Sequence, residues 1–192
     1  KLGGVFSHND TPDEMAAAIT QTVAAYTDLS KTKTGALMVF ERQNLLDDAI
    51  KTGTVLDCAV NAELLKNIFW NKAPLHDGAV IVRGGRIAGA GCMLPLSGNV
   101  NLSRELGMRH RAGIGASEAS DAVVAIVSEE TGSISVAVGG MLKRHLAPET
   151  LDRLLRNELM PEQEAEAKPK FSLAGIFKSK KGEDADVEQN QK

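Results

Sequence analysis

Residues 74–82 read Pro-Leu-His-Asp-Gly-Ala-Val-Ile-Val, and this stretch decides the class of fold. The polar pair His76 and Asp77 is followed by a glycine and then by apolar residues that do not alternate with polar ones. Such a pattern is typical of a loop that leads into a strand buried on both faces. Gly78 has no Cβ, so a ligand or another backbone segment can come close to Asp77. From this stretch alone, a plain turn before a strand and a functional loop are equally good interpretations.

Helical and strand patterns alternate along the chain before this stretch. A helix is predicted from Thr11 to Ser30, because Thr11 and Glu14 suit a capping box and apolar residues recur at helical spacing. Residues 35–40 (GALMVF) follow as a buried strand. Residues 43–60 are ambiguous, with 55–60 as one candidate strand. Asn61 can then cap a second helix, which ends before Pro74.

Strand patterns dominate the chain after this stretch. Glycine pairs at 84–85 and 139–140 predict tight hairpin turns, because both positions of such a turn need positive φ angles. A last helix is expected from Pro148. The remaining strands are expected at residues 87–94, 122–127, 133–138 and 141–143. The alternation of strands and helices indicates an α/β fold.

Length, composition and charge limit how the chain can be organised. Its 192 residues, 43% of them apolar, suit one domain at 11–160, a short linker at 1–10 and a charged, disordered tail at 161–192. A net charge of −3 gives no general attraction to nucleic acid. Two cysteines without metal-ligand spacing argue against a zinc site or a disulfide framework and for a reducing compartment. No apolar run is long enough to cross a bilayer, and the missing initiator methionine suggests a fragment.

A second polar stretch lies in the glycine-rich segment 107–118, where Arg109, His110 and Arg111 are consecutive. Two arginines at the start of a short helix suit a polyphosphate, because they supply charge-assisted donors beside helix-end amides. A solvated helix face is the commoner reason for such a triplet. Neither a Walker loop nor a dinucleotide fingerprint is present.

A third polar stretch, Ser128-Glu129-Glu130, follows the apolar run 122–127. Carboxylates at the end of a strand suit a divalent cation, although they suit a solvated turn equally well. Together the three stretches contain groups that could hold a metal ion or act as a base, groups that could neutralise phosphates and a hydroxyl that could donate a hydrogen bond. This set is what nucleotidyl transfer requires, and the residues alone indicate an α/β domain that binds a metal–nucleotide complex.

Residues 75–79 (LHDGA), Arg109-His110-Arg111 with Ser117-Glu118 after it, and residues 127–132 (VSEETG) resemble the diadenylate cyclase family. The resemblance extends over residues 11–159. It implies a twisted mixed β-sheet surrounded by helices. It also implies that two ATP molecules are joined into cyclic di-AMP, with release of two pyrophosphates, by a face-to-face homodimer.

The resemblance also implies a role for each site residue. Asp77 would activate the ribose 3′-hydroxyl, and His76 and Glu130 would ligate Mg²⁺ or Mn²⁺. Arg109, His110 and Arg111 would act on the phosphates as catalytic residues. The substrate-binding positions would be Gly78, Ala79, Leu94, Met108, Ser128 and Glu129.

Met108 departs from the family, whose members usually carry threonine at this position. This difference leaves an alternative open, in which the chain is a catalytically weak or inactive ATP-binding regulatory module of the same fold.

The chain resembles the membrane-anchored branch of the family in residues 74–75 and 93–97 (MLPLS). This likeness implies the cytoplasmic domain of a cell-membrane protein whose transmembrane helices lie outside the sequence. A YbbR-repeat regulator and phosphoglucosamine mutase are the implied protein partners. No nucleic-acid partner is expected.

Overall fold

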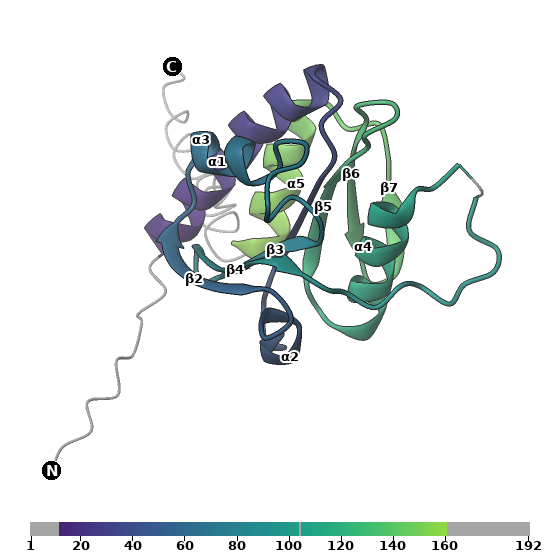
Figure 1. Cartoon of the computed structure of the whole chain (residues 1–192), viewed down its shortest axis with the longest axis horizontal. Helices are drawn as coiled ribbons and strands as arrows, with labels where there is room; N and C mark the ends of the chain where they lie inside the picture. Colours follow the sequence, from purple (N-terminus) through teal and green to yellow (C-terminus); the bar gives the residue numbers. More distant parts are fainter. Residues whose placement is uncertain (1–11, 104, 161–192) are drawn as a thin grey trace, which may run out of the picture. The chain divides into compact units, whose positions relative to one another are not determined.

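A single seven-stranded sheet organises residues 12–103 and 105–160, which are the part of the chain that the computed structural model describes. The strands are ordered β2-β4-β3-β1-β5-β6-β7 across the sheet (Figure 1). Their bounds are β1 Ala36–Phe40, β2 Thr54–Ala59, β3 Ala79–Arg83, β4 Arg86–Cys92, β5 Val123–Val127, β6 Ile134–Val138 and β7 Met141–Lys143. The helices are α1 Pro12–Lys31, α2 Asp47–Ile50, α3 Ala62–Ile68, α4 Met108–Ala119 and α5 Pro148–Leu159.

Strand directions bring the chemically interesting loops to one end of the sheet. β1 pairs in parallel with β3, and every other pair in the sheet is antiparallel. The sheet is therefore mixed, as the family resemblance implied. Because Ala36 pairs with Val127, the start of β1 lies beside the end of β5. The segments before β1 and β3, after β4 and between β5 and β6 consequently meet at the same end.

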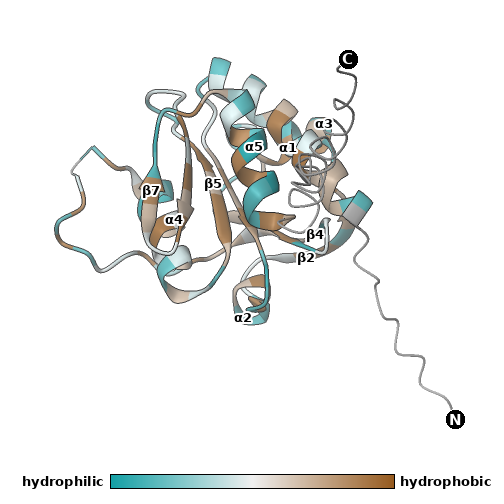
Figure 2. Ribbon diagram, turned by 180° about the vertical axis from the view of Figure 1, so that it is seen from behind, coloured by the Kyte–Doolittle hydropathy of each residue, from teal (hydrophilic) through white to brown (hydrophobic). Residues whose placement is uncertain are grey.

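Both faces of the central strands are covered by helices. Along β1, Met38 and Phe40 pack in the core cluster that includes residues of α1, α3 and α5. Leu37 and Val39 point the other way, into the cluster that includes residues of α4 and α2. Figure 2 shows apolar residues along β5, which is also covered on both faces. This two-sided burial explains why these strands read as continuous apolar runs, and it confirms the strand expected after Asp77.

Most predicted elements are present, with small shifts in their ends. The ambiguous segment 43–60 contains the short helix α2 and the edge strand β2, so the candidate strand at 55–60 was placed one residue late. The strand expected over 87–94 ends earlier, at Cys92. Both glycine pairs form hairpin turns, with φ angles of 56° and 81° at Gly84 and Gly85.

Several sequence-based expectations fall outside the described residues. These are the linker at 1–10, the helix cap at Thr11 and the charged tail at 161–192. Within the described part of the chain, no helix combines the length and the apolar character that crossing a membrane requires.

Candidate active site

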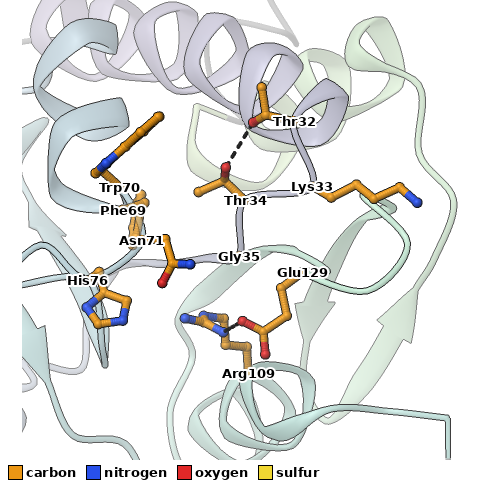
Figure 3. Close-up of a pocket in the computed structure, with 10 residues that line it drawn as sticks. All are labelled: Thr32, Lys33, Thr34, Gly35, Phe69, Trp70, Asn71, His76, Arg109 and Glu129. Atoms are coloured by element: carbon orange, nitrogen blue, oxygen red, sulfur yellow. Dashed lines mark hydrogen bonds and ion pairs between the residues drawn. The ribbon is translucent and has the colours of Figure 1, made fainter.

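A cleft of about 380 Å³ opens at the end of the sheet where β1 and β3 begin and β5 ends (Figure 3). It is formed by the C-terminal end of α1, the segment after α3, the first turn of α4 and the turn after β5. Its lining residues are Thr32, Lys33, Thr34, Gly35, Phe69, Trp70, Asn71, His76, Arg109 and Glu129. One residue from each of the three polar stretches therefore reaches the same cleft.

Arg109 forms the floor of the cleft because a glycine leaves room for it. Its Nη1 donates to Glu129 Oε2 across 2.6 Å. A Cβ added to Gly35 would lie 2.8 Å from Arg109 Cζ, so any larger residue would push the guanidinium away. Nε of Arg109 is buried and has no hydrogen-bond partner among the described residues. Arg109 is thus held in place by packing and by a single ion pair.

His76 is fixed in one tautomer by the backbone. Its Nδ1 lies 2.6 Å from the carbonyl oxygen of Ala73. A carbonyl oxygen can only accept, so Nδ1 carries the proton and Nε2 keeps a free lone pair. Metal-binding histidines commonly have such an arrangement, because the second hydrogen bond orients the ring. His76 lines the cleft and, as a neutral imidazole, is therefore suited to ligate a cation through Nε2.

The Asp77-Gly78-Ala79 segment combines an exposed acid with a closely packed backbone. The Asp77 side chain is exposed, and no hydrogen bond to its carboxylate is present within residues 12–103 and 105–160. Gly78 has a φ of 96°, and a Cβ on it would lie 2.7 Å from the Gly91 carbonyl carbon. The group that lies close to Gly78 is thus the backbone at the end of β4, at Gly91 and Cys92. Ala79 has no exposed surface and packs in the core, so its methyl group cannot contact a substrate.

The three consecutive residues of the Arg-His-Arg triplet point in different directions, because successive residues on a helix are rotated by about 100°. Arg109 enters the cleft. His110 is buried, with 5% of its surface exposed. Nη2 of Arg111 donates to the Ser103 carbonyl, at 3.4 Å, and Arg111 does not line the cleft. Of the three residues, only Arg109 lines the cleft.

Burial sets the protonation of His110. Removal from water lowers the pKa of the His110 imidazole, and the positive charge of Arg144 lowers it further. The negative charge of Glu130 acts in the opposite direction and raises the pKa. His110 is therefore neutral down to a lower pH than a free histidine.

The turn Ser128-Glu129-Glu130 is tied both to itself and to α1. The Thr131 amide donates to Ser128 Oγ at 3.3 Å, and the Gly132 amide donates to the Ser128 carbonyl at 2.9 Å. Oγ of Ser30, in α1, donates to the Gly132 carbonyl at 2.6 Å. Glu130 is exposed. These bonds hold Glu129 against Arg109 at the edge of the cleft.

Leu94 and Met108 lie outside the cleft lining. Leu94 is half-buried against the core cluster that includes residues of α4. Met108 is the first residue of α4 and is 65% exposed. Both remain near the same end of the sheet, since β4 ends and α4 begins there.

Sequence reasoning missed the upper wall of the cleft, which comes from residues 32–35 and 69–71. Thr32 Oγ1 and Thr34 Oγ1 are hydrogen-bonded at 2.9 Å, and Trp70 is 67% exposed (Figure 3). Two signals were present in the sequence. Residues 31–35 (KTKTG) place a glycine directly before a buried strand, as Gly78 does, and Trp70 is the single tryptophan of the chain.

Within residues 12–103 and 105–160, the acidic and histidine side chains are too dispersed to form a complete metal centre on their own. Among the described residues, no group of three His, Cys, Asp or Glu side chains is placed to hold a metal ion. Mg²⁺ in nucleotide sites commonly takes one or two protein ligands and completes its shell with phosphate oxygens and water. A cation bound at His76 would therefore need oxygens from a substrate.

Comparisons with known proteins match most of the described chain. The family model described as "DisA bacterial checkpoint controller nucleotide-binding" matches residues 23–142. The cyclic di-AMP synthase CdaA of Bacillus subtilis is 46% identical over 160 residues, which cover 81% of this chain and 58% of that protein. A diadenylate cyclase of Listeria monocytogenes is 47% identical over 132 residues, or 69% of this chain and 48% of that protein. The chain thus spans about half the length of the curated relatives it matches.

Solved structures show the same fold. A double mutant of DacA from Staphylococcus aureus has a TM-score of 0.73 at 44% identity, covering 74% of this chain and 95% of that one. A hypothetical membrane spanning protein from Bacillus cereus has a TM-score of 0.64 at 45% identity, covering 67% of this chain and 63% of that one. The likeness includes the sheet and the helices that cover it.

Proposed function

The chain belongs to the DAC family of DisA-type nucleotide-binding domains, and from that membership we propose that it is a diadenylate cyclase, which condenses two ATP molecules into cyclic di-AMP and two pyrophosphates. The observation that carries the proposal is the cleft at the end of the sheet. There His76, Arg109 and Glu129 converge from three segments far apart in the sequence. Asp77 follows His76 directly.

Arg109 is the proposed phosphate ligand. Its present partner, the Glu129 carboxylate, has 64% of its side chain exposed, and exposed ion pairs contribute little to stability. A triphosphate carries more negative charge than one carboxylate and offers oxygens for bidentate contact with the guanidinium. ATP can therefore take the place of Glu129 beside Arg109 at small cost.

Asp77 is the proposed base. Its carboxylate is exposed and unencumbered by hydrogen bonds within the described residues, so it is available to a ribose 3′-hydroxyl. In the reaction, the 3′-oxygen forms a bond to the α-phosphorus of the second ATP and its proton passes to Asp77. The bond between the α-phosphorus and the α,β-bridging oxygen breaks, and pyrophosphate leaves. Two such steps close the cyclic product.

Mg²⁺ or Mn²⁺ is the proposed cofactor, and His76 with Glu130 would hold it. The free lone pair on His76 Nε2 supports this assignment, because the hydrogen bond from Nδ1 to Ala73 orients the ring. When bound, the cation would act as a Lewis acid on the phosphate oxygens.

A homodimer is the proposed active unit. Each copy would hold one ATP at its cleft, and each 3′-hydroxyl would attack the ATP on the facing copy. Two identical half-reactions are related by a two-fold axis, so an isologous pairing of one surface satisfies both. A monomer could bind ATP but could not complete the cycle.

The cellular setting is proposed from resemblance. We infer a cytoplasmic domain of a cell-membrane protein, with a YbbR-repeat regulator and phosphoglucosamine mutase as partners. The likeness to a hypothetical membrane spanning protein supports the first part of this inference.

The test is to incubate the purified chain with ATP and Mn²⁺ or Mg²⁺ and to follow product by chromatography. Cyclic di-AMP and pyrophosphate are expected in a 1:2 ratio. Replacing ATP with 3′-deoxy-ATP removes the nucleophile and is expected to stop the reaction. Measurable ATP binding without product at any protein concentration would contradict the proposal and would support the inactive regulatory module instead.

A further inference from the structure

Three buried polar atoms without hydrogen-bond partners belong to α4, to β6 and to the residue that follows β7. They are His110 Nε2, Ser135 Oγ and Arg144 Nε, and they make up three of the four such side-chain atoms in the described part of the chain. Ser135 has no exposed surface, and His110 has 5%. Buried polar groups are normally paired, so a concentration of them at one place calls for an explanation.

The strand register places Ser135 and Arg144 together. Ala137 of β6 pairs with Leu142 of β7, and both pack in the core cluster that includes residues of α4. Side chains two residues apart on a strand share a face. Ser135, two residues before Ala137, and Arg144, two residues after Leu142, therefore both point toward α4.

The position of α4 then brings His110 over this pair. The Gly140 amide donates to Ser117 Oγ at 3.1 Å, so the later part of α4 lies over the turn between β6 and β7. His110 is about two helical turns earlier, which corresponds to the other end of β6. The effect of Arg144 on the pKa of His110 supports this proximity.

Arg144 also reaches the segment in front of α4. Its Nη1 lies 3.7 Å from Glu105 Oε2, three residues before the helix begins. Arg144 thus pairs with Glu105, just before the first turn of α4, and lies close enough to His110 to influence its charge. The other charged groups around His110 are Glu130, on the turn after β5, and the two arginines that flank it in α4.

We propose that Arg144 is a positioning residue for the nucleotide site, which acts through His110 to fix the first turn of α4 and hence the direction in which Arg109 enters the cleft. Arg144 does not line the cleft and is not proposed to touch the substrate. Arg109 and His110 are consecutive in the first turn of α4, so a movement of that turn that carries the buried imidazole also carries the backbone of Arg109. The inference rests on the proposed function, because it assigns Arg109 to the phosphates.

The first test compares Arg144→Met, Arg144→Lys and Lys143→Met for cyclic di-AMP synthesis. Arg144→Met is expected to lower kcat by about 10- to 100-fold, because misplacing a catalytic group by about 1 Å costs up to that much. Arg144→Lys should restore part of the rate, and Lys143→Met, which removes an exposed charge from the neighbouring position, should leave it unchanged. Wild-type kcat in Arg144→Met, or a fall that matches the loss of folded protein, would overturn the proposal.

A double-mutant cycle separates action through His110 from an independent effect. His110→Gln and Arg144→Met are combined and compared with each single variant. If Arg144 acts through His110, the double variant loses no more rate than the worse single one. Multiplication of the two fold-losses would overturn the proposal.

A spectroscopic readout does not depend on turnover. The imidazole NMR signals of His110 are expected to move in Arg144→Met and to stay in place in Lys143→Met. Unmoved signals in Arg144→Met would refute the positioning role even if activity fell. If the wild-type chain makes no cyclic di-AMP, the proposed function fails, and the NMR comparison still decides whether Arg144 positions His110.

Discussion

Arg109 shows how a single side chain in the cleft depends on a residue from another element. Its guanidinium occupies the space over Gly35, and its only charged partner in the described residues is Glu129. A charge-assisted hydrogen bond from Arg109 to a bound phosphate would be worth about 1.5–3 kcal/mol, so we expect small displacements of the guanidinium to carry a large cost for the proposed function. Asp77, by contrast, is exposed and has no charged or hydrogen-bond partner for its carboxylate among the residues that the structure describes.

Replacing Gly35 with alanine tests this dependence. The added Cβ would lie 2.8 Å from Arg109 Cζ, and the flexible arginine would move rather than the backbone. We expect kcat/KM for cyclic di-AMP synthesis to fall about 10- to 100-fold, which corresponds to the loss of one charge-assisted hydrogen bond. Unfolding in urea should change little. Gly98→Ala is the matched control, because a Cβ there meets nothing within 4 Å; a large loss of stability in Gly35→Ala would contradict this explanation.

Asp77→Asn tests the proposed base. The amide cannot accept the ribose proton, and general-base catalysis typically contributes 10²- to 10⁴-fold. We expect turnover to fall by at least about 100-fold. ATP affinity and stability should stay nearly unchanged, because the carboxylate is exposed and makes no hydrogen bond within the described residues. Rates of product formation and ATP titrations measure the two effects, and a wild-type rate would remove Asp77 from the mechanism.

Met108→Thr tests the one position where the chain departs from the family it resembles. Met108 is the first residue of α4 and is 65% exposed, so the substitution leaves the core intact. A hydroxyl beside Arg109 adds a donor for ribose or phosphate. We expect the rate to rise by about threefold to tenfold, as one neutral hydrogen bond contributes about 0.5–1.5 kcal/mol. An unchanged rate would show that the added hydroxyl makes no useful hydrogen bond to ribose or phosphate. Met108→Ala is the control for loss of the methionine side chain.

At the scale of elements, the ends of helices hold the loops that form the site. The C-terminal end of α1 is bonded to the turn after β5 through Ser30 and Gly132. The start of α4 presents Arg109 to the cleft, while the same turn buries His110. The segment after α3 carries Trp70, Asn71 and His76, so the stability of that short helix bears on the site.

Asn61 is the residue that starts α3, and its removal gives a prediction for this element. Oδ1 of Asn61 accepts hydrogen bonds from the Glu63 and Leu64 amides, at 2.9 and 3.2 Å. Asn61→Ala should lower the free energy of unfolding by about 1 kcal/mol, because two amides lose their acceptor. The midpoint of urea unfolding measures the change. Asn61→Asp keeps the acceptor and should cost much less, so equal losses in both variants would rule out capping as the cause.

At the scale of the whole molecule, the strand order assembles the cleft. β1 lies between β3 and β5 in the sheet, although more than 35 residues separate β1 from β3 and more than 80 separate it from β5. This order places the loops before β1 and β3 beside the turn after β5. One copy of the chain thereby supplies one cleft, and the proposed chemistry needs two.

The dependence of rate on protein concentration tests the proposed homodimer. If two copies must face each other, specific activity rises with protein concentration below the dimer dissociation constant and levels off above it. Activity assays over a dilution series, with analytical ultracentrifugation on the same samples, measure this relation. Constant specific activity down to fully monomeric protein would contradict the two-copy scheme.

The local features of this protein follow from its amino-acid sequence alone. Apolar runs without alternation marked β1, β3 and β5, the glycine pairs marked the hairpin turns, and Asn61 marked the start of α3. Each of these signals depends on neighbours within a few residues, because burial, turn geometry and capping are local properties of the chain. The three polar stretches were identifiable for the same reason, and the likeness to a known family joined them into one site.

Which residues face the cleft, by contrast, is seen from the tertiary structure and not from the sequence. It placed Gly35 under Arg109, put Thr32, Thr34 and Trp70 on the upper wall, filled the space beside Gly78 with the backbone at the end of β4 and buried His110. These contacts join residues far apart in the sequence. They depend on strand order, on register and on the rotation of α4 against the sheet, and residue patterns within one segment do not specify how that segment packs against another.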